Sequence, residues 1–284
     1  MREIRIERRP QAMRQLVEEA RRQGRLVGFV PTMGGLHEGH ASLTRAAAEA
    51  CDEVAVSIFV NPSQFGPGED FDRYPRSAEA DCRLLAEAEA SWVFMPEVES
   101  IYPPGDATRV VVGGPAVRWE GEHRPGHFEG VATVVSRLLA MVPAQRAYFG
   151  AKDWQQTVVV RRMVRDLALP VEIVVCPTIR EPDGLAMSSR NAYLSPDERR
   201  RATALSAGLA AAEAAWRAGS RAAAIEAELR RRLEAADVVV DYAALVDPES
   251  LEPLAADAVR GLPAIALVAG RVGSTRLLDN CMLE

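Results

Sequence analysis

The chain has 284 residues, more than one domain usually contains, so we expect two domains or one domain with a large extension. Hydrophobic residues make up 48% of the sequence and charged residues 26%, a balance that excludes a disordered or fibrous chain. The net charge of −6, from 34 basic and 40 acidic residues, gives no electrostatic footprint for nucleic acid or an anionic membrane.

The cysteines and the N-terminal stretch predict a reduced, cytoplasmic location. Four cysteines, at positions 51, 82, 176 and 281, form no C-x-x-C pair, so neither a zinc site nor a disulfide framework is predicted. Residues 1–7 mix charges where a signal peptide would have an apolar core. The longest apolar runs are far shorter than a membrane span, so we expect no membrane association.

Short apolar runs alternate with helical patterns up to about residue 180, which is typical of βαβ units. Strands are predicted, in chain order, at 26–30, 54–60, 92–95, 147–149 and 171–175. Helices with apolar residues three or four apart are predicted at 41–50, 78–90, 131–141 and 154–167. Because uninterrupted apolar strands need cover on both faces, the sequence predicts an open α/β fold with a doubly wound, mainly parallel sheet of Rossmann-like type.

The pattern changes near residue 181, which predicts a domain of residues 1–180 and a smaller C-terminal α+β domain of residues 181–284. Ser195 is expected to cap a helix that has Pro196 at its first position. An alanine-rich helix follows to about residue 217, then a helix at 221–236 and strands at 238–246, 264–269 and 275–279.

The strongest functional signal follows the strand predicted at 26–30. His37 and His40 come after a Gly-rich turn, where backbone N–H groups and the positive end of a helix suit a phosphate. Residues three apart on a helix share a face, so both imidazoles are predicted to point at one anion and stabilise its charge. Zinc binding is the weaker interpretation, because the metalloprotease motif spaces its histidines four apart. The pattern indicates nucleotide chemistry.

Segments after other predicted strands suit the same chemistry, because ligands bind at the carboxyl ends of strands in open α/β sheets. Lys152, the only lysine in the sequence, is a candidate phosphate clamp, and an exposed lysine at a helix start is the alternative. The Ser-Ser-Arg sequence at 188–190 supplies donors for nucleotide phosphates. Asn61 and Gln64 are uncharged amides that either bind a small substrate or cap a turn.

Six motifs, in this order along the chain, resemble the pantothenate synthetase (pantoate–β-alanine ligase) family, a relative of the nucleotidylyltransferases and class I aminoacyl-tRNA synthetases. They are PTMGGLHEGH at 31–40, FVNPSQFG at 59–66, YPR at 74–76, RPGHFEGV at 124–131, YFGAKDWQQ at 148–156 and MSSRN at 187–191. Ala151 departs from the family, which commonly has Glu there. The resemblance spans essentially the whole chain.

The resemblance implies the ATP-dependent condensation of (R)-pantoate with β-alanine through a pantoyl adenylate, releasing AMP and pyrophosphate. The catalytic residues that it implies are His40, which acts at the α-phosphate, His37 and Lys152. It implies that pantoate is bound by Gln64 and Gln156, with Asn61 beside them. The implied ATP-binding residues are Met33, Gly34, Gly35, Leu36, His37, Glu38, Gly39, His40, Gly150, Ala151, Lys152, Asp153, Ile179, Met187, Ser188, Ser189 and Arg190.

The family also implies features beyond these contacts. Mg²⁺ is expected to bridge the ATP phosphates, with Asp81 as a candidate ligand. A homodimer is expected, and residues 181–284 are a candidate lid over ATP.

Two other functions fit parts of the pattern. A nucleotidylyltransferase acting on another, phosphorylated small substrate shares the two histidines but needs basic residues where this chain has Asn61 and Gln64. A non-catalytic nucleotide-binding module gains little from keeping both histidines together with Lys152. The ligase is therefore the favoured interpretation.

Overall fold

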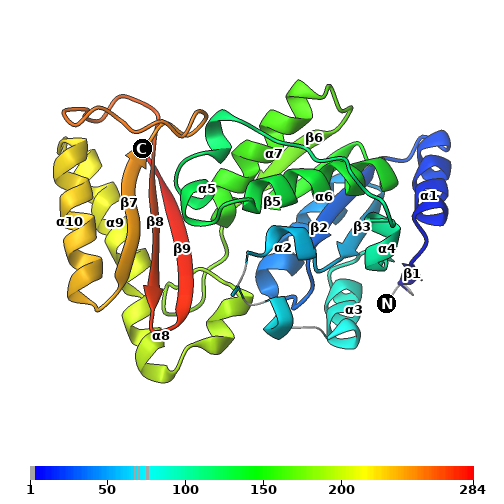
Figure 1. Cartoon of the computed structure of the whole chain (residues 1–284), viewed down its shortest axis with the longest axis horizontal. Coiled ribbons are helices and arrows are strands. Elements are labelled where there is room, and N and C mark those ends of the chain that lie inside the picture. The colour runs from blue at the N-terminus through cyan, green and yellow to red at the C-terminus, as the bar shows by residue number, and fades with distance from the viewer. Residues whose placement is uncertain (1–3, 67, 70, 75–76) are drawn as a thin grey trace.

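The computed structural model describes residues 4–66, 68–69, 71–74 and 77–284, and these residues form two separate β-sheets (Figure 1). The strands of the larger sheet are β1 Arg5–Glu7, β2 Val27–Thr32, β3 Glu53–Ile58, β4 Trp92–Phe94, β5 Arg146–Gly150 and β6 Glu172–Cys176. All are parallel, in the order β1-β4-β3-β2-β5-β6. The doubly wound parallel sheet predicted from the sequence is confirmed.

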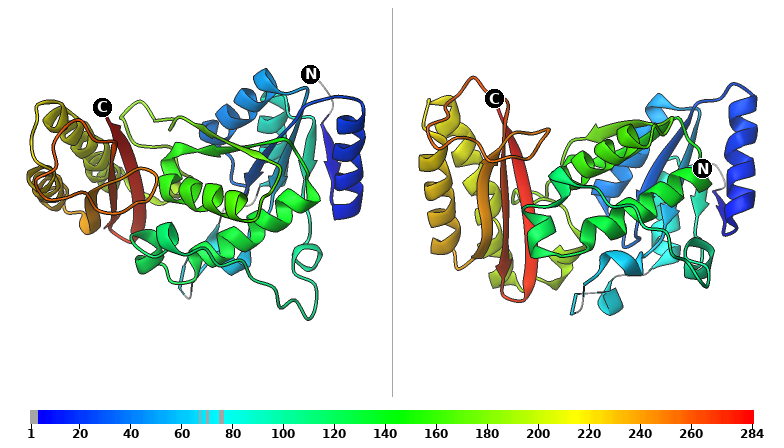
Figure 2. Two further views of the ribbon diagram at one scale, coloured as in Figure 1. Left: turned by 90° about the horizontal axis from the view of Figure 1, so that it is seen from above. Right: turned by 45° about the horizontal axis from the view of Figure 1, so that its top comes forward.

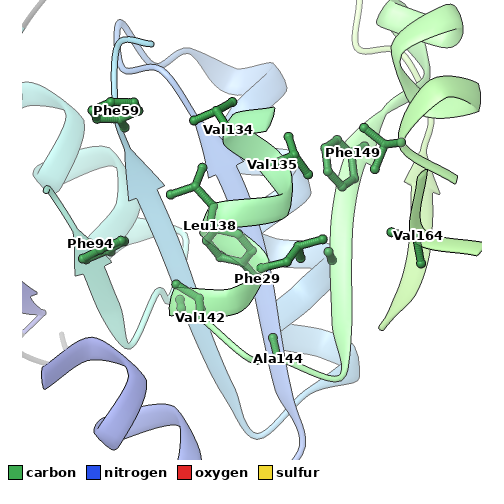
Figure 3. Close-up of a cluster of buried hydrophobic side chains, with 14 of the residues drawn as sticks. Phe29, Phe59, Phe94, Val134, Val135, Leu138, Val142, Ala144, Phe149 and Val164 are labelled. Atoms are coloured by element: carbon green, nitrogen blue, oxygen red, sulfur yellow. The ribbon is translucent and has the colours of Figure 1, made fainter. Parts of the chain in front are cut away.

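Helices cover both faces of this sheet. One face packs against α1 Pro10–Arg22, α6 His127–Met141 and α7 Trp154–Asp166, and the other against α2 Glu38–Ala50 and α3 Ala78–Glu87. Consecutive strand residues point to opposite faces, so Phe29 packs under α6 while Val30 packs under α2. Figure 3 shows Val135 and Leu138 of α6 over Phe29 and its neighbours. The short helices α4 Val98–Ile101 and α5 Glu120–His123 lie between β4 and α6.

The sequence analysis missed β1 and α1. β1 has three residues at the edge of the sheet and buries only Glu7, whose carboxylate accepts hydrogen bonds from the backbone N–H groups of Arg8 and Arg9. A strand with this pattern has no apolar run to detect. α1 does carry a signal, because Met13 and Val17 are buried four residues apart.

The order of the strands brings two turns together. From the central β2 the chain continues to β3 and β4 on one side, and it later adds β5 and β6 on the other. β2 and β5 are therefore neighbours, paired at Phe29 and Ala147. Their carboxyl ends form the switch point at which open α/β sheets bind ligands, and they lead into residues 33–40 and 150–153.

The C-terminal part forms a smaller α+β unit. Its elements are α8 Pro196–Ala202, α9 Ala204–Arg217, α10 Ala222–Ala235, β7 Val239–Val246, β8 Ala264–Val272 and β9 Thr275–Leu283, with the strands antiparallel in the order β7-β8-β9. α9 and α10 cover one face, and the other lies against α7 and the loop of Trp119 (Figure 2). Ser195 caps α8 in a capping box with Glu198, as predicted.

An ion pair on a buried carboxylate joins the two units. Arg276 on β9 donates two hydrogen bonds of 2.7 Å to the carboxylate of Glu120 on α5, and Tyr242 adds a third of 2.8 Å. Arg276 also pairs with Asp241 at 2.6 Å. The division at residues 180 and 181 stays a prediction. No helix in the described part of the chain has the length and apolar character needed to cross a bilayer.

Candidate active site

The Gly-rich turn after β2 is shaped by two glycines and a carboxylate. Gly34 and Gly35 have φ of 89° and 62°, in the left-handed region that favours glycine. Asp81, on α3, accepts hydrogen bonds from the backbone N–H groups of Gly35 at 3.0 Å and Leu36 at 2.8 Å. These bonds satisfy donors that the turn leaves outside any sheet or helix, so Asp81 fixes the path of the chain into α2.

The two histidines form the start of α2 differently from the prediction. His37 is the N-cap residue, outside the helix, and its Nδ1 accepts a hydrogen bond of 3.2 Å from the N–H of Gly39. The Nδ1 of His40 accepts a bond of 3.3 Å from the N–H of His37, which completes a reciprocal capping box. The ring centroids are 4.2 Å apart, and both rings line one cavity. They meet through capping geometry rather than by sharing a helix face.

This geometry makes both rings neutral donors. A neutral imidazole carries one hydrogen, so accepting at Nδ1 assigns that hydrogen to Nε2 in His37 and in His40. Burial, followed by the charges of His37 and Lys152, lowers the pKa of His40 to about 3. Burial and the charge of Lys152 also lower the pKa of His37. At neutral pH the cavity therefore has two uncharged N–H donors beside one lysine.

Lys152 enters the cavity from the end of β5. It lies in a single 3-10 turn, η4 Ala151–Asp153, between β5 and α7. Its side chain is mostly covered, and its Nζ is 3.5 Å from the carboxylate of Asp153. Both residues line the cavity. The predicted placement of Lys152 at the top of the sheet is seen in the structure, and the charge of the lysine lowers the pKa of both imidazoles.

Residues beyond β6 complete this side of the cavity. A tight turn at Gly184, φ 89°, brings Met187 back to Ile179, with a backbone hydrogen bond of 2.9 Å from Met187 N–H to the Ile179 carbonyl. Ser188 then caps η5 Ser189–Tyr193 and accepts from the N–H of Arg190 at 3.3 Å. This return of the chain brings the predicted Ser-Ser-Arg sequence to the same cavity as the histidines.

The part of the cavity wall that carries Asn61 and Gln64 is formed where two segments approach each other closely. Gly130 on α6 lies so near η1 Pro62–Gln64 that a Cβ there would be 2.3 Å from the Ser63 carbonyl oxygen. Asn61 donates to Gln64 Oε1 at 3.1 Å and to the Gly130 carbonyl at 3.2 Å. Its own oxygen accepts from Ser63 and from Tyr102.

These hydrogen bonds show a difference between Asn61 and Gln64, which the sequence analysis treated together. Both hydrogens of the Asn61 amide are engaged, so in this structure Asn61 braces the loop at the cavity wall. Gln64 uses one N–H toward Met33 Sδ at 2.8 Å and keeps a second donor. Gln64 and Gln156 both line the cavity.

Sequence reasoning gave no role to two further parts of the wall. One is apolar and includes Val131, Val135 and Leu138 of α6; a helical stripe of this kind is indistinguishable from core in the sequence. The other is Arg124 with His127, inside the RPGHFEGV motif. His127 Nδ1 donates to the Gln64 carbonyl at 2.9 Å, and burial with the charge of Arg124 lowers the pKa of His127 to about 4.

Most of the predicted site residues meet in this cavity. Those that line it are Met33, His37, Gly39, His40, Asn61, Gln64, Gly150, Lys152, Asp153, Gln156, Ile179, Met187, Ser188, Ser189 and Arg190. Gly34, Gly35, Leu36, Glu38 and Ala151 are not among the residues that line it, and Glu38 is exposed and pairs with Arg45. Of the YPR motif, Tyr74 lines the cavity, whereas Pro75 and Arg76 lie outside the described residues.

The geometry does not support Asp81 as a metal ligand. Its side chain is 3% exposed, both oxygens accept backbone hydrogen bonds, and it is not part of the cavity wall. Among the residues that the structure describes, no three His, Cys, Asp or Glu side chains are grouped as a metal site would need. Asp153 is the one carboxylate in the described part of the cavity wall.

Comparison with known proteins places this arrangement in a family. Residues 5–282 match the family model described as pantoate-beta-alanine ligase. The chain belongs to the pantoate-beta-alanine ligase family. Within it, the pantothenate synthetase of Acidiphilium cryptum is 58% identical over 256 residues, covering 89% of this chain and 90% of that protein. The Rubrobacter xylanophilus protein of the same name is 53% identical over 285 residues, covering 97% of each chain.

Solved structures agree over nearly the whole chain. A pantothenate synthetase from Thermus thermophilus is 50% identical with a TM-score of 0.91, covering 98% of this chain and 99% of that one. A pantoate-beta-alanine ligase from Francisella tularensis, complexed with beta-gamma ATP and beta-alanine, is 31% identical with a TM-score of 0.82 over 99% of this chain and 98% of that one. The two-sheet architecture is therefore that of pantoate-beta-alanine ligases.

Proposed function

We propose that this chain condenses pantoate with β-alanine in the cavity between β2, β5 and the residue 187–190 loop, using ATP to activate the carboxylate. The observation that carries this proposal is the meeting of two neutral imidazoles and the chain's single lysine at the switch point of the sheet. A site of this kind offers fixed donors for charge that develops on a phosphorus centre.

The first step forms a mixed anhydride. A carboxylate oxygen of pantoate attacks the α-phosphorus of ATP, the bond from that phosphorus to the bridging oxygen breaks, and pyrophosphate leaves. The Nε2–H of His40 donates to an α-phosphate oxygen, and because burial lowers the pKa of His40 to about 3 in the free protein, the ring meets ATP as a neutral donor. His37 holds the nucleotide beside it, while Lys152 and Arg190 offset the negative charge of the phosphates.

The second step forms the amide. The amino nitrogen of β-alanine attacks the acyl carbon, the bond from this carbon to the phosphate oxygen breaks, AMP leaves and the nitrogen loses a proton. Gln64 and Gln156 bind pantoate through its hydroxyl and carboxylate oxygens. The apolar wall of Val131, Val135 and Leu138 suits the two methyl groups on the quaternary carbon of pantoate.

Mg²⁺ enters this proposal with ATP, held chiefly by the phosphates as is usual for this ion. Asp153, the one carboxylate among the described residues of the cavity wall, is the residue that we propose would lie beside the Mg²⁺. Two further expectations join the proposal: a cytoplasmic homodimer, and residues 181–284 acting as a lid over ATP. Light scattering on the purified protein, and X-ray scattering with and without an ATP analogue, test them.

Exchange kinetics test the function itself. The protein, given ATP and Mg²⁺, is expected to exchange labelled pyrophosphate into ATP only when pantoate is added, and to release AMP in quantity only when β-alanine follows. Absence of pantoate-dependent exchange would overturn the proposal. Exchange that starts with a phosphorylated small molecule instead would support a nucleotidylyltransferase, and nucleotide binding without exchange would support a binding module.

A further inference from the structure

The backbone of the turn that carries Lys152 receives no capping hydrogen bond from a side chain of its own segment. Gly150, at the start of η4, has no side chain, and Asp153, at the start of α7, makes no capping hydrogen bond. A lysine stem has four rotatable carbons, so the position of its ammonium depends on where the backbone of the turn is held. Hydrogen bonds from another part of the chain are therefore needed to hold that backbone in one position.

The C-terminal strand supplies this support. The side-chain amide of Asn280, on β9, donates to the carbonyl of Ala151 at 2.9 Å and to that of Lys152 at 2.7 Å. Asn280 is buried, at 8% exposure. Both of its hydrogens are therefore used on two consecutive carbonyls of the lysine turn, across a separation of 128 residues.

The register of β9 explains how a distant strand reaches this turn. Side chains alternate along a strand, so Arg276, Leu278 and Asn280 share the face of β9 turned toward the larger domain. Arg276 pairs with Glu120, and Leu278 packs in the apolar cluster that includes Trp154. The part of β9 that carries Asn280 is thus attached to the larger unit by two contacts on the same face, one ionic and one apolar.

We propose that Asn280 is a positioning residue for the reaction: through the backbone of Ala151 and Lys152 it aims the lysine ammonium into the ATP site from the other domain. This inference rests on the proposed function, because it assigns Lys152 the role given there. Fixing a group in its reactive position is a large part of catalysis, and a misplacement of about 1 Å can cost on the order of 10²-fold in rate.

A double-mutant cycle on the full chain separates positioning from general stability. Asn280→Ala is expected to lower pantoate-dependent pyrophosphate exchange by roughly tenfold or more, with most of the loss in kcat. In the Lys152→Ala background the same substitution is expected to change the rate by less than about twofold, because the group it positions is gone. Loss of the same size in both backgrounds would overturn the inference.

The single lysine gives a second readout that needs no turnover. Protein labelled with ¹⁵N and ¹³C in lysine is expected to show one ε-CH₂ signal, which shifts or broadens in Asn280→Ala. Met282→Ala, an exposed residue on the same face of β9, serves as the matched control and is expected to leave the signal unchanged. Asn280→Asp keeps the shape but has no N–H donor, and is expected to move the signal as Asn280→Ala does.

The outcomes are distinguishable. An unchanged lysine signal in a folded Asn280→Ala or Asn280→Asp protein would contradict the inference while leaving the proposed function intact. A wild-type protein without pantoate-dependent exchange would instead overturn the proposed function. If Asn280→Ala does not fold, the Asn280→Asp variant carries both the cycle and the spectroscopic comparison.

Discussion

The turn at residues 33–40 and the turn at residues 150–153 line the same cavity but depend on different parts of the chain. The first is held by neighbours in its own domain: the carboxylate of Asp81 and the reciprocal cap of His37 and His40. The second is held by Asn280 on the last strand of the other domain. One half of the proposed ATP site therefore needs only the parallel sheet, and the other also needs the unit built on the antiparallel sheet.

The largest expected effect comes from separating the domains. Arg276→Met leaves the buried carboxylate of Glu120 without its bidentate ion pair, so we expect the free energy of unfolding to fall by roughly 3–5 kcal/mol. Chemical denaturation measures it. Arg162→Met, in an exposed pair with Asp166 on α7, is the matched control and should cost no more than about 1 kcal/mol. Equal losses in both variants would contradict the account of the domain contact.

The next largest effect is expected on the rate of the reaction, from the residues that line the cavity. His40→Ala removes the neutral donor at the α-phosphate, so we expect the rate of pantoate-dependent pyrophosphate exchange to fall by roughly 10²–10³-fold. Lys152→Ala should lower it by on the order of 10²-fold. His123→Ala, an exposed histidine outside the cavity wall, is the control. A near wild-type rate would remove His40 from the mechanism.

Acid is expected to lower the stability of the fold through the buried imidazoles of His40 and His127. The folded-state pKa values of His40, about 3, and His127, about 4, lie below the usual 6.5, so the unfolded chain binds more protons between these values. The contribution of each imidazole to the free energy of unfolding is therefore full above pH 6.5 and falls as the pH is lowered, by roughly 2 kcal/mol per imidazole between pH 7 and 5. Denaturation midpoints in this range measure the slope. His127→Gln should reduce it, and an unchanged slope would contradict the assignment.

The smallest effect tests what Asp81 does. Asp81→Ala removes the acceptor for two backbone N–H groups of the Gly-rich turn, so we expect roughly 1–3 kcal/mol of lost stability and a raised KM for ATP. Glu79→Ala, exposed on the same helix, is the control. Because the account gives Asp81 no metal contact, the Mg²⁺ concentration for half-maximal rate should stay unchanged. A shift in that concentration would contradict the account and support Asp81 as a ligand of Mg²⁺.

The same division explains what could be predicted from sequence. Apart from β1, the strands of the parallel sheet and the residues after them follow from local patterns, so the sequence placed the Gly-rich turn, both histidines and Lys152 at the ends of strands that meet at the cavity. The relation of His37 to His40 was predicted incorrectly, because a helix-face argument does not register that His37 is the cap. The brace role of Asn61 depends on Gly130, a contact across 69 residues. Asn280 gave no local signal, because an asparagine in a strand pattern does not reveal the turn it supports.

Isotope transfer tests the central claim most directly, namely that a pantoate oxygen attacks the α-phosphorus in this cavity. Pantoate labelled with ¹⁸O in its carboxylate is incubated with ATP, Mg²⁺, β-alanine and the protein, and the products are analysed by mass spectrometry. The account predicts one ¹⁸O atom in the phosphate of each AMP released. Label in inorganic phosphate together with ADP, or AMP without label, would contradict it.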